Sequence, residues 1–275
     1  MPFDAFGVPI FVICRDKVTP LRQLVEWLEG HGYQRIVLVD NASTYPPLLE
    51  YYDHSPHEVV RLAENLGPKD SIWGTGVVDR YAAGSYYAVT DSDVIPDPVC
   101  PGDAVAYFHW ALNRFPSFVK AGFGLRIDDL PAHNELAAAV RRWEYWFWVR
   151  RFSGNLYSAP IDTTFALYRP HSPFVFRPAI RTGKPYVARH EPWYVDTRNR
   201  SAEDRYYREH CDPAIAHWDL EGHAVPARRT PGAALKAKLQ WRAHVLLRLP
   251  QNRDVPKRYR PSRAHHGGRV TPSGE

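Results

Sequence analysis

Three short apolar runs in the first quarter of the chain, with a helical pattern between neighbouring runs, constrain the fold most. They cover residues 8–14, 36–39 and 58–62, and the first two are almost uninterrupted. Such runs are typical of strands buried on both faces of a parallel sheet. Apolar residues recur at helical spacing over 21–28, and a shorter helical pattern covers 48–52. Strands that alternate with helices are joined by right-handed crossovers. We therefore predict an α/β fold with a Rossmann-like, mostly parallel sheet flanked by helices.

The alternation continues through the middle of the chain. We predict further strands over 86–90, 118–127 and 163–169, and further helices over 73–81, 104–115 and 135–151. The last of these helices carries Trp143, Trp146 and Phe147 at helical spacing. An aromatic stripe of this kind favours a core-facing helix, and a platform for a sugar ring or a lipid-facing edge are the alternatives.

Composition and charge separate a globular part from a basic tail. The chain has 275 residues with 44% hydrophobic residues and a net charge of +5. Three scattered cysteines, no secretory signal pattern and no apolar run of eighteen residues lead us to expect a cytoplasmic protein. From Arg228 onward, twelve Lys or Arg residues face two acids. We expect a basic helix over 233–249, followed by disordered chain.

The basic tail indicates an anionic partner. A helix that lies on an anionic membrane surface fits the placement of Leu235, Leu239, Leu246 and Leu249 on one face. A helix that packs back on the domain is the alternative. We expect no nucleic acid partner, and the oligomeric state is left open.

Two aspartates one residue apart, Asp91 and Asp93, follow the strand predicted over 86–90. A buried carboxylate without a partner is very unfavourable, so both side chains should lie at the strand end and face something positive. Ligands bind at the carboxyl ends of the strands in an open α/β sheet. Oxygen donors there suit Mg²⁺ or Mn²⁺ with substrate phosphates as further ligands. An Asp-x-Asp alone is more often a solvated turn.

Polar residues also follow the second and third predicted strands, at Asp40-Asn41 and at Asn65. This spacing is typical of a nucleotide-binding α/β half. The sequence has neither the Gly-x-Gly-x-x-Gly pattern nor the phosphate-loop pattern after its first strand. A nucleotide would therefore be held by side chains, and its diphosphate would need a metal.

These segments resemble the N-terminal half of a family-2-type glycosyltransferase of the GT-A fold over about residues 7–98. The resemblance is carried by residues 9–15, 37–44 (Val-Leu-Val-Asp-Asn-Ala-Ser-Thr), 64–67 (Glu-Asn-Leu-Gly) and 89–93 (Val-Thr-Asp-Ser-Asp). It implies a GT-A-like domain over 1–228, with a nucleotide-sugar half (1–98) and an acceptor half (99–228), followed by the basic extension (229–275).

The resemblance also implies roles for single residues. Asp93 would bind the metal, Asp91 would lie near the metal or the ribose, and Asp40 would contact the nucleobase. The expected nucleotide-sugar contacts are Arg15, Asp40, Asn41, Asn65, Asp91 and Ser92.

His190 is our candidate for a further metal ligand, because related sugar transferases place a histidine after a late strand. Imidazole suits Mn²⁺ better than Mg²⁺. The neighbouring Trp193 and Tyr194 are candidates for the acceptor site, together with Asp128. An ordinary surface or core histidine is the alternative for His190.

Transfer with inversion needs a base for the acceptor hydroxyl. We favour Asp129, which follows a predicted strand on the ligand side, and place Asp162 second. Asp128 and Glu144 are further candidates for the base, and Asp128 has an alternative role as a helix cap. Inverting or retaining stereochemistry stays open.

The sequence therefore predicts a metal-dependent glycosyltransferase that moves a sugar from a UDP-sugar or GDP-mannose to a hydroxyl acceptor. The acceptor could be a polysaccharide, a glycolipid or a small metabolite. The alternatives are a sugar-phosphate nucleotidyltransferase and a non-enzymatic carbohydrate-binding module.

Overall fold

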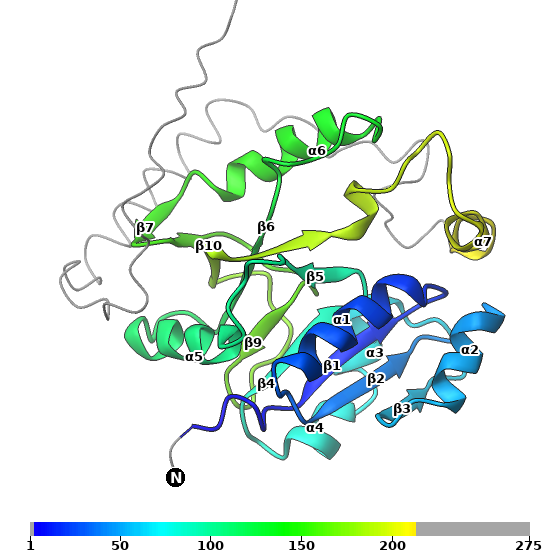
Figure 1. The fold of residues 1–275 in the computed structure, drawn as a ribbon. Coiled ribbons are helices and arrows are strands. Elements are labelled where there is room, and N and C mark those ends of the chain that lie inside the picture. The colour runs from blue at the N-terminus through cyan, green and yellow to red at the C-terminus, as the bar shows by residue number, and fades with distance from the viewer. Residues whose placement is uncertain (1–2, 213–275) are drawn as a thin grey trace, which may run out of the picture.

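The computed structural model describes residues 3–212, and the predicted basic helix and tail lie outside these residues. The described chain is a mixed α/β fold built on one ten-stranded sheet (Figure 1). The strand order is β3-β2-β1-β4-β9-β6-β10-β8-β7, and β5 pairs with β10. This confirms the predicted α/β class and a central, mostly parallel sheet flanked by helices.

The N-terminal half follows the predicted alternation. Its strands pair in parallel, with Ile10 of β1 opposite both Ile36 of β2 and Ala88 of β4. The elements of this half are β1 (Ile10–Cys14), α1 (Thr19–Gly30), β2 (Ile36–Asp40), α2 (Pro46–Asp53), β3 (Glu58–Arg61), α3 (Gly67–Trp73), α4 (Val77–Ala82) and β4 (Tyr87–Asp91).

The two faces of the N-terminal strands are buried against different helices. Alternate residues Ile10, Val12 and Cys14 of β1 pack with Leu21 and Leu24 of α1 in the larger core. The residues between them point to the other face, where the core contains Ile72 of α3 and Val77 of α4. Burial on both faces explains why β1 and β2 are apolar at nearly every position.

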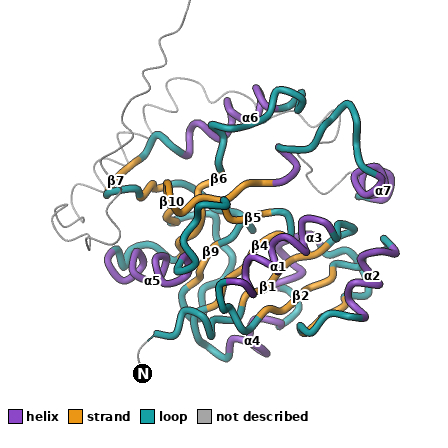
Figure 2. The backbone as a smooth tube through the Cα atoms, in the orientation of Figure 1, coloured by secondary structure: helices purple, strands orange, loops and turns teal. Residues whose placement is uncertain are grey.

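The second half mixes strand directions. β9 runs antiparallel to both β4 and β6, whereas β6 and β10 are parallel. The tube in Figure 2 shows the long β10 crossing the molecule between α6 and the N-terminal strands. The elements are β5 (Val94–Pro96), α5 (Ala104–Arg114), β6 (Lys120–Leu125), α6 (Ala137–Glu144), η1 (Tyr145–Phe147), β7 (Arg151–Ser153), β8 (Leu156–Ser158), β9 (Ala166–Tyr168), β10 (Ala179–His190), η2 (Glu191–Trp193) and α7 (Ala202–His210).

Two predicted helices are wrong in extent. The helix predicted over 135–151 ends at Glu144, continues as one 3₁₀ turn and gives way to β7. Arg151 of β7 instead pairs with Tyr157 of β8, so sheet pairing replaces helical bonds in an aromatic segment of modest helix propensity. The helix predicted over 73–81 begins only at Val77, as α4, because α3 ends at Trp73 and residues 74–76 (Gly-Thr-Gly) separate the two helices.

The first helix receives its cap from a distant part of the chain. Val18 occupies the N-cap position of α1 and makes no side-chain capping hydrogen bond. The carboxylate of Glu203, next to the start of α7, accepts hydrogen bonds from the backbone N–H groups of Val18 (2.5 Å) and Thr19 (3.0 Å). A buried carboxylate at a helix N-terminus satisfies otherwise unpaired donors and the positive end of the helix dipole.

Within residues 3–212, no helix combines the length and the hydropathy that a membrane crossing would require.

Candidate functional site

A cavity of about 780 Å³ opens at the carboxyl ends of β1 and β4, between the two halves of the sheet. Its lining comes from the loops after β1, β2 and β3, from the β4–β5 turn and from the end of β10. Further parts of the wall come from α6, η1, residues 160–164 and residues 174–176. The cavity therefore lies where ligands bind in open α/β sheets.

Three carboxylates gather on one side of this cavity: Asp91, Asp93 and Asp162. Asp91 ends β4 and accepts a hydrogen bond from the Thr163 hydroxyl to Oδ2 at 2.8 Å. Antiparallel pairing of β4 with β9 brings the segment before β9 alongside Asp91. Burial raises the pKa of Asp91, and together with the charges of Asp93 and Asp162 it brings that pKa to about 8. An accumulation of buried negative charge of this kind favours a bound cation.

The register of β5 against β10 brings His190 beside Asp93. Val94 pairs with His190 in the antiparallel ladder, and the Glu191 N–H donates to the Asp93 carbonyl oxygen at 2.8 Å. His190 Nε2 lies 3.5 Å from Asp93 Oδ1. Burial opposes charge on both groups, but each stabilises the charge of the other. The pKa of Asp93 is therefore lowered, and the pKa of His190 is raised.

The chemistry of Asp91, Asp93 and His190 suits a hard divalent cation. Asp93 Oδ1 and His190 Nδ1 are buried, and neither has a hydrogen-bond partner. A buried carboxylate oxygen without a donor is unfavourable unless a cation completes its surroundings. Among residues 3–212, no three His, Cys, Asp or Glu side chains are grouped as a ready metal site. Asp91, Asp93 and His190 would therefore need ligands from a substrate to complete the coordination of Mn²⁺ or Mg²⁺.

Another part of the cavity lining is basic and amide-rich. Arg15 Nη1 donates to the carbonyl oxygens of Asn41, at 2.7 Å, and of Ala42. Asn41 in turn donates from its side-chain amide to Asn65 Oδ1 at 2.7 Å. These contacts tie together the loops after the first three strands. Arg15, Asn41 and Asn65 line the cavity, as do the basic side chains Lys17 and Lys69.

Asp40 and Ser92 occupy positions with little access to solvent. Asp40 is 1% exposed, accepts hydrogen bonds from the Ser43 N–H and the Tyr52 hydroxyl, and is not among the lining residues. Its carboxylate therefore organises the loop beside the cavity. Ser92 lines the cavity, and its backbone N–H donates to the Ile13 carbonyl oxygen.

The predicted base Asp129 and its neighbour Asp128 lie outside the cavity lining. Asp129 Oδ2 is paired with Arg189 Nη2 at 2.7 Å and with Arg126 Nη1 at 3.2 Å, while its Oδ1 accepts from the Tyr194 hydroxyl at 2.6 Å. Asp128 is paired with Arg126 and Lys184. The structure thus separates Asp128, Asp129 and Tyr194 from the wall that contains Asp162 and Trp193.

One buried ion pair in the cavity wall could not be predicted from the sequence. Arg181 Nη1 lies 2.8 Å from Glu144 Oε2, and both side chains are at least 95% buried. Burial raises the pKa of Glu144 to about 7, an effect to which Asp162 adds and which Arg181 opposes. The two residues are 37 positions apart, on α6 and β10. Neither position follows an apolar run or belongs to a motif.

A second unpredicted contribution comes from α7 and the residues after it, which cover the edge of the N-terminal half. Tyr206 donates to the Thr44 carbonyl oxygen at 3.0 Å, and Lys17 Nζ lies 4.7 Å from the centre of the Tyr207 ring. Tyr207, Cys211 and Asp212 reach the cavity lining. Figure 1 shows α7 at the edge of the molecule beyond the loops that follow β1 and β2.

Comparisons with known proteins leave the family open. No family model matches the sequence, and no curated protein matches it. A solved structure titled HddC from Yersinia pseudotuberculosis is 18% identical, with a TM-score of 0.34; the alignment covers 43% of this chain and 58% of that one. A second, titled as HddC complexed with GMP-PN, gives the same score and identity over 45% and 60%. A third, titled as a mycobacterial protein, is 14% identical, with a TM-score of 0.41, over 72% and 69%.

Proposed function

We propose that this protein is a metal-dependent glycosyltransferase of GT-A-like fold that uses a nucleoside diphosphate sugar as donor. The observation that carries the proposal is the charge distribution in one cavity. Three aspartates at one side have no Lys or Arg ion-pair partner among the described residues, and Arg15, Lys17 and Lys69 line the same cavity. A diphosphate with a bound cation complements both sets of charges.

The sheet supports a GT-A-like arrangement of the donor half. The strands β3, β2, β1 and β4 are parallel, and the Asp-x-Asp segment lies at the end of β4, where it lines the cavity. The loops after β1, β2 and β3 carry Arg15, Asn41 and Asn65. These side chains offer hydrogen bonds to a nucleotide in place of a glycine-rich loop.

Asp93, Asp91 and His190 would hold the cation. A bound Mn²⁺ or Mg²⁺ would neutralise charge on the diphosphate leaving group. Arg15 and Lys17 would orient the same phosphates by charge-assisted hydrogen bonds. Thr163 keeps the Asp91 carboxylate in place through its hydroxyl.

Asp162 is the better-supported base for the acceptor hydroxyl. It lines the cavity beside Asp91, whereas the carboxylate of Asp129 is engaged by Arg189, Arg126 and Tyr194 outside the lining. A base must reach the proton that it removes, so access decides between the two. Asp162 would accept the proton of the hydroxyl as the new glycosidic bond forms and the nucleoside diphosphate leaves.

The proposal is tested by incubating the full chain with a panel of UDP-, GDP-, CDP- and dTDP-sugars and Mn²⁺, with release of nucleoside diphosphate as the measurement. We expect slow release from one donor, and we expect excess chelator to abolish it. Equal release in chelator would refute the role of the metal. Consumption of a nucleoside triphosphate with a sugar phosphate would instead establish a nucleotidyltransferase. Binding without turnover of any kind would leave a carbohydrate-binding protein.

A further inference from the structure

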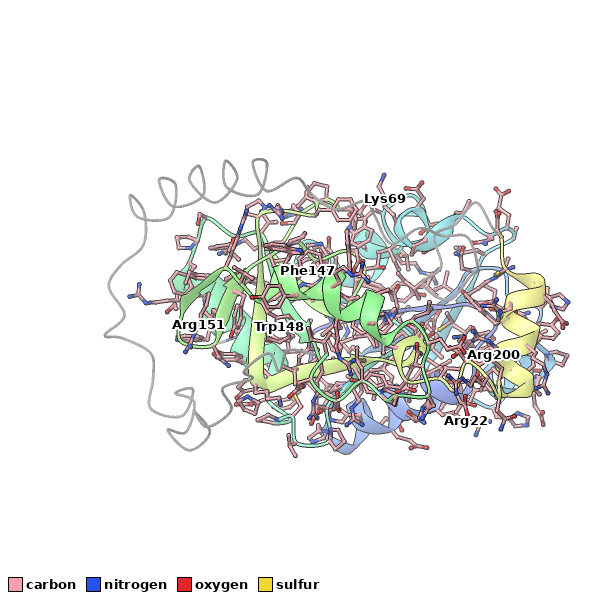
Figure 3. All side chains as sticks on the ribbon, turned by 90° about the horizontal axis from the view of Figure 1, so that it is seen from above. Arg22, Lys69, Phe147, Trp148, Arg151 and Arg200 are labelled. Atoms are coloured by element: carbon pink, nitrogen blue, oxygen red, sulfur yellow. The ribbon has the colours of Figure 1, made fainter. Side chains whose placement is uncertain are left out.

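The cavity has a third sector that the donor does not explain, and this sector is apolar. It consists of Trp143, Phe147, Pro160, Phe174, Val175 and Phe176, all of which line the cavity. Figure 3 shows Phe147 and the neighbouring Trp148 beside α6, seen from above the sheet. The aromatic helix segment, for which we considered a core role and a ligand role, thus contributes to a cavity wall.

Neighbouring residues link both walls of this sector to the proposed base. The Phe147 ring centre lies 4.4 Å from the Arg181 guanidinium, which binds Glu144, and the charge of Asp162 acts on Glu144. On the other wall, the Phe174 ring centre lies 5.0 Å from Lys120 Nζ, which donates to the Asp162 carbonyl oxygen at 3.2 Å. A molecule whose hydroxyl reaches Asp162 would therefore place its remainder against these rings.

The sector offers few polar groups to such a molecule. The Arg181 guanidinium is bound by Glu144 and by the Pro160 carbonyl oxygen, and its side chain is only 5% exposed. A sugar ring carries several hydroxyls, and each one that is buried without a partner is unfavourable. A hydrocarbon chain makes no such demand and gains from the removal of apolar surface from water.

The apolar sector also opens to the surface. Phe176 lines the cavity and is 57% exposed. Exposed aromatic side chains continue on η1, where Tyr145 and Trp146 are 58% and 52% exposed. An occupant longer than the sector could therefore extend outward along apolar surface.

We propose that the acceptor of this enzyme has a polar head that bears the reacting hydroxyl and an attached alkyl or prenyl chain, which binds between the α6–η1 segment and residues 174–176. The inference rests on the proposed function, because the donor and Asp162 define where the acceptor hydroxyl must lie. The polar head faces Asp162, and the chain covers Phe147, Phe174 and Phe176. This arrangement gives selectivity for an amphiphilic acceptor over a free sugar or a polysaccharide end.

The test measures binding of methyl, butyl and hexyl β-glucosides to the full chain by calorimetry, below their micelle concentrations and without donor. A fully buried methylene contributes about 0.8 kcal/mol, or about fourfold in affinity. We expect at least twofold per methylene, so that hexyl glucoside binds at least about thirtyfold more tightly than methyl glucoside. The substitutions Phe176→Ala and Phe147→Ala should each remove more than half of this gain in free energy.

Phe6→Ala is the matched control, because Phe6 is an exposed aromatic residue at 39% and does not line the cavity. It should leave the dependence on chain length unchanged. Equal affinity for the three glucosides would overturn the inference. So would Phe176-dependent binding to phosphatidylcholine vesicles without any dependence on glucoside chain length, which would make the sector a membrane-docking surface.

The test also separates this inference from the proposed function. If chelator-sensitive donor turnover is found but chain length has no effect, the inference fails and the transferase stands. If chain length matters but no donor is turned over, the apolar sector stands as a binding site and the transferase proposal fails.

Discussion

Two clusters of three aspartates lie near the same end of the sheet, and their surroundings differ in charge. Asp91, Asp93 and Asp162 line the cavity, where His190 is the nearest cationic partner. Asp97, Asp128 and Asp129 follow β5 and β6 and are paired with three basic side chains. Those side chains are Arg126, Lys184 and Arg189.

The difference shows how a structural carboxylate is distinguished from a candidate ligand. In the paired cluster, Arg126 Nη1 lies 2.6 Å from Asp97 Oδ2, and each carboxylate contacts at least one basic group. That cluster is close to neutral and needs nothing further. In the cavity cluster the negative charge is in excess, so folding leaves a site that a cation would stabilise.

The largest expected effect is a difference in activity between a variant of the cavity cluster and a variant of the paired cluster. We expect Asp93→Asn to lower nucleoside diphosphate release at least about 1,000-fold, because a neutral amide is a poor ligand for a hard cation. Asp129→Asn should lower it less than about tenfold, because Asp129 lies outside the cavity lining. Steady-state release from the accepted donor measures both variants.

Asp93→Asn should lower the midpoint of urea unfolding only modestly and leave the variant folded, because it removes the pairing with His190 that holds the pKa of Asp93 down. A loss of activity in Asp129→Asn as large as in Asp93→Asn would reverse our assignment of the two clusters.

The second effect concerns Lys120, a buried lysine that contacts the backbone of Asp162. Its Nζ bonds the Asp162 carbonyl oxygen and the Tyr168 hydroxyl, and burial lowers its pKa to about 7. The unfolded chain has the ordinary lysine pKa of about 10.4 and binds more protons between pH 7 and 10. The stability of the wild type should therefore rise with pH across this window, as the penalty for the buried charge disappears.

Lys120→Met removes the titrating group, so it should be more stable than the wild type at pH 6.5, by about 4 to 5 kcal/mol, and similar at pH 10. Urea unfolding at several pH values gives the comparison. Parallel stability curves for the two proteins would mean that Lys120 is charged in the fold and helps to neutralise the cavity cluster.

The smallest effect tests the paired cluster. Asp97 is 2% exposed and accepts from the Val99 N–H in addition to its pairing with Arg126. Asp97→Asn should lower the free energy of unfolding by about 2 kcal/mol, because it leaves a partly buried guanidinium with less compensation. Donor turnover below the unfolding midpoint should stay within a factor of about three of wild type. A stable but inactive variant would place the paired cluster in the reaction.

Local sequence patterns could predict the part of the cavity lining that contains Asp91, Asp93, Asn41 and Asn65. Each of these residues lies within four residues of the end of an apolar strand, and strand ends of a parallel sheet meet at one edge. His190 could also be predicted, because it ends a strand. The register of β5 and β10 places it beside Asp93.

Whether a carboxylate is paired with a basic side chain could not be predicted in the same way. Asp129 and Asp162 both stand beside predicted strands, and only the fold shows that Arg189, 60 residues later, pairs with Asp129. The pair of Glu144 and Arg181 depends equally on contacts between distant elements. The helix predicted over 135–151 failed because its pattern is local, whereas the pairing of β7 with β8 is set by the sheet.

The cap that Glu203 provides for α1 bears on how the chain is made. The carboxylate acts on backbone groups 184 and 185 positions earlier in the sequence. A ribosome adding about 5 to 20 residues per second would need roughly 10 to 40 s to reach Glu203 after α1 begins. During that interval the first helix of the N-terminal half has its leading amides uncapped, and the nascent half-domain is the species that chaperones would meet. The N-terminal half therefore reaches its final stability only when the last described helix has been synthesised.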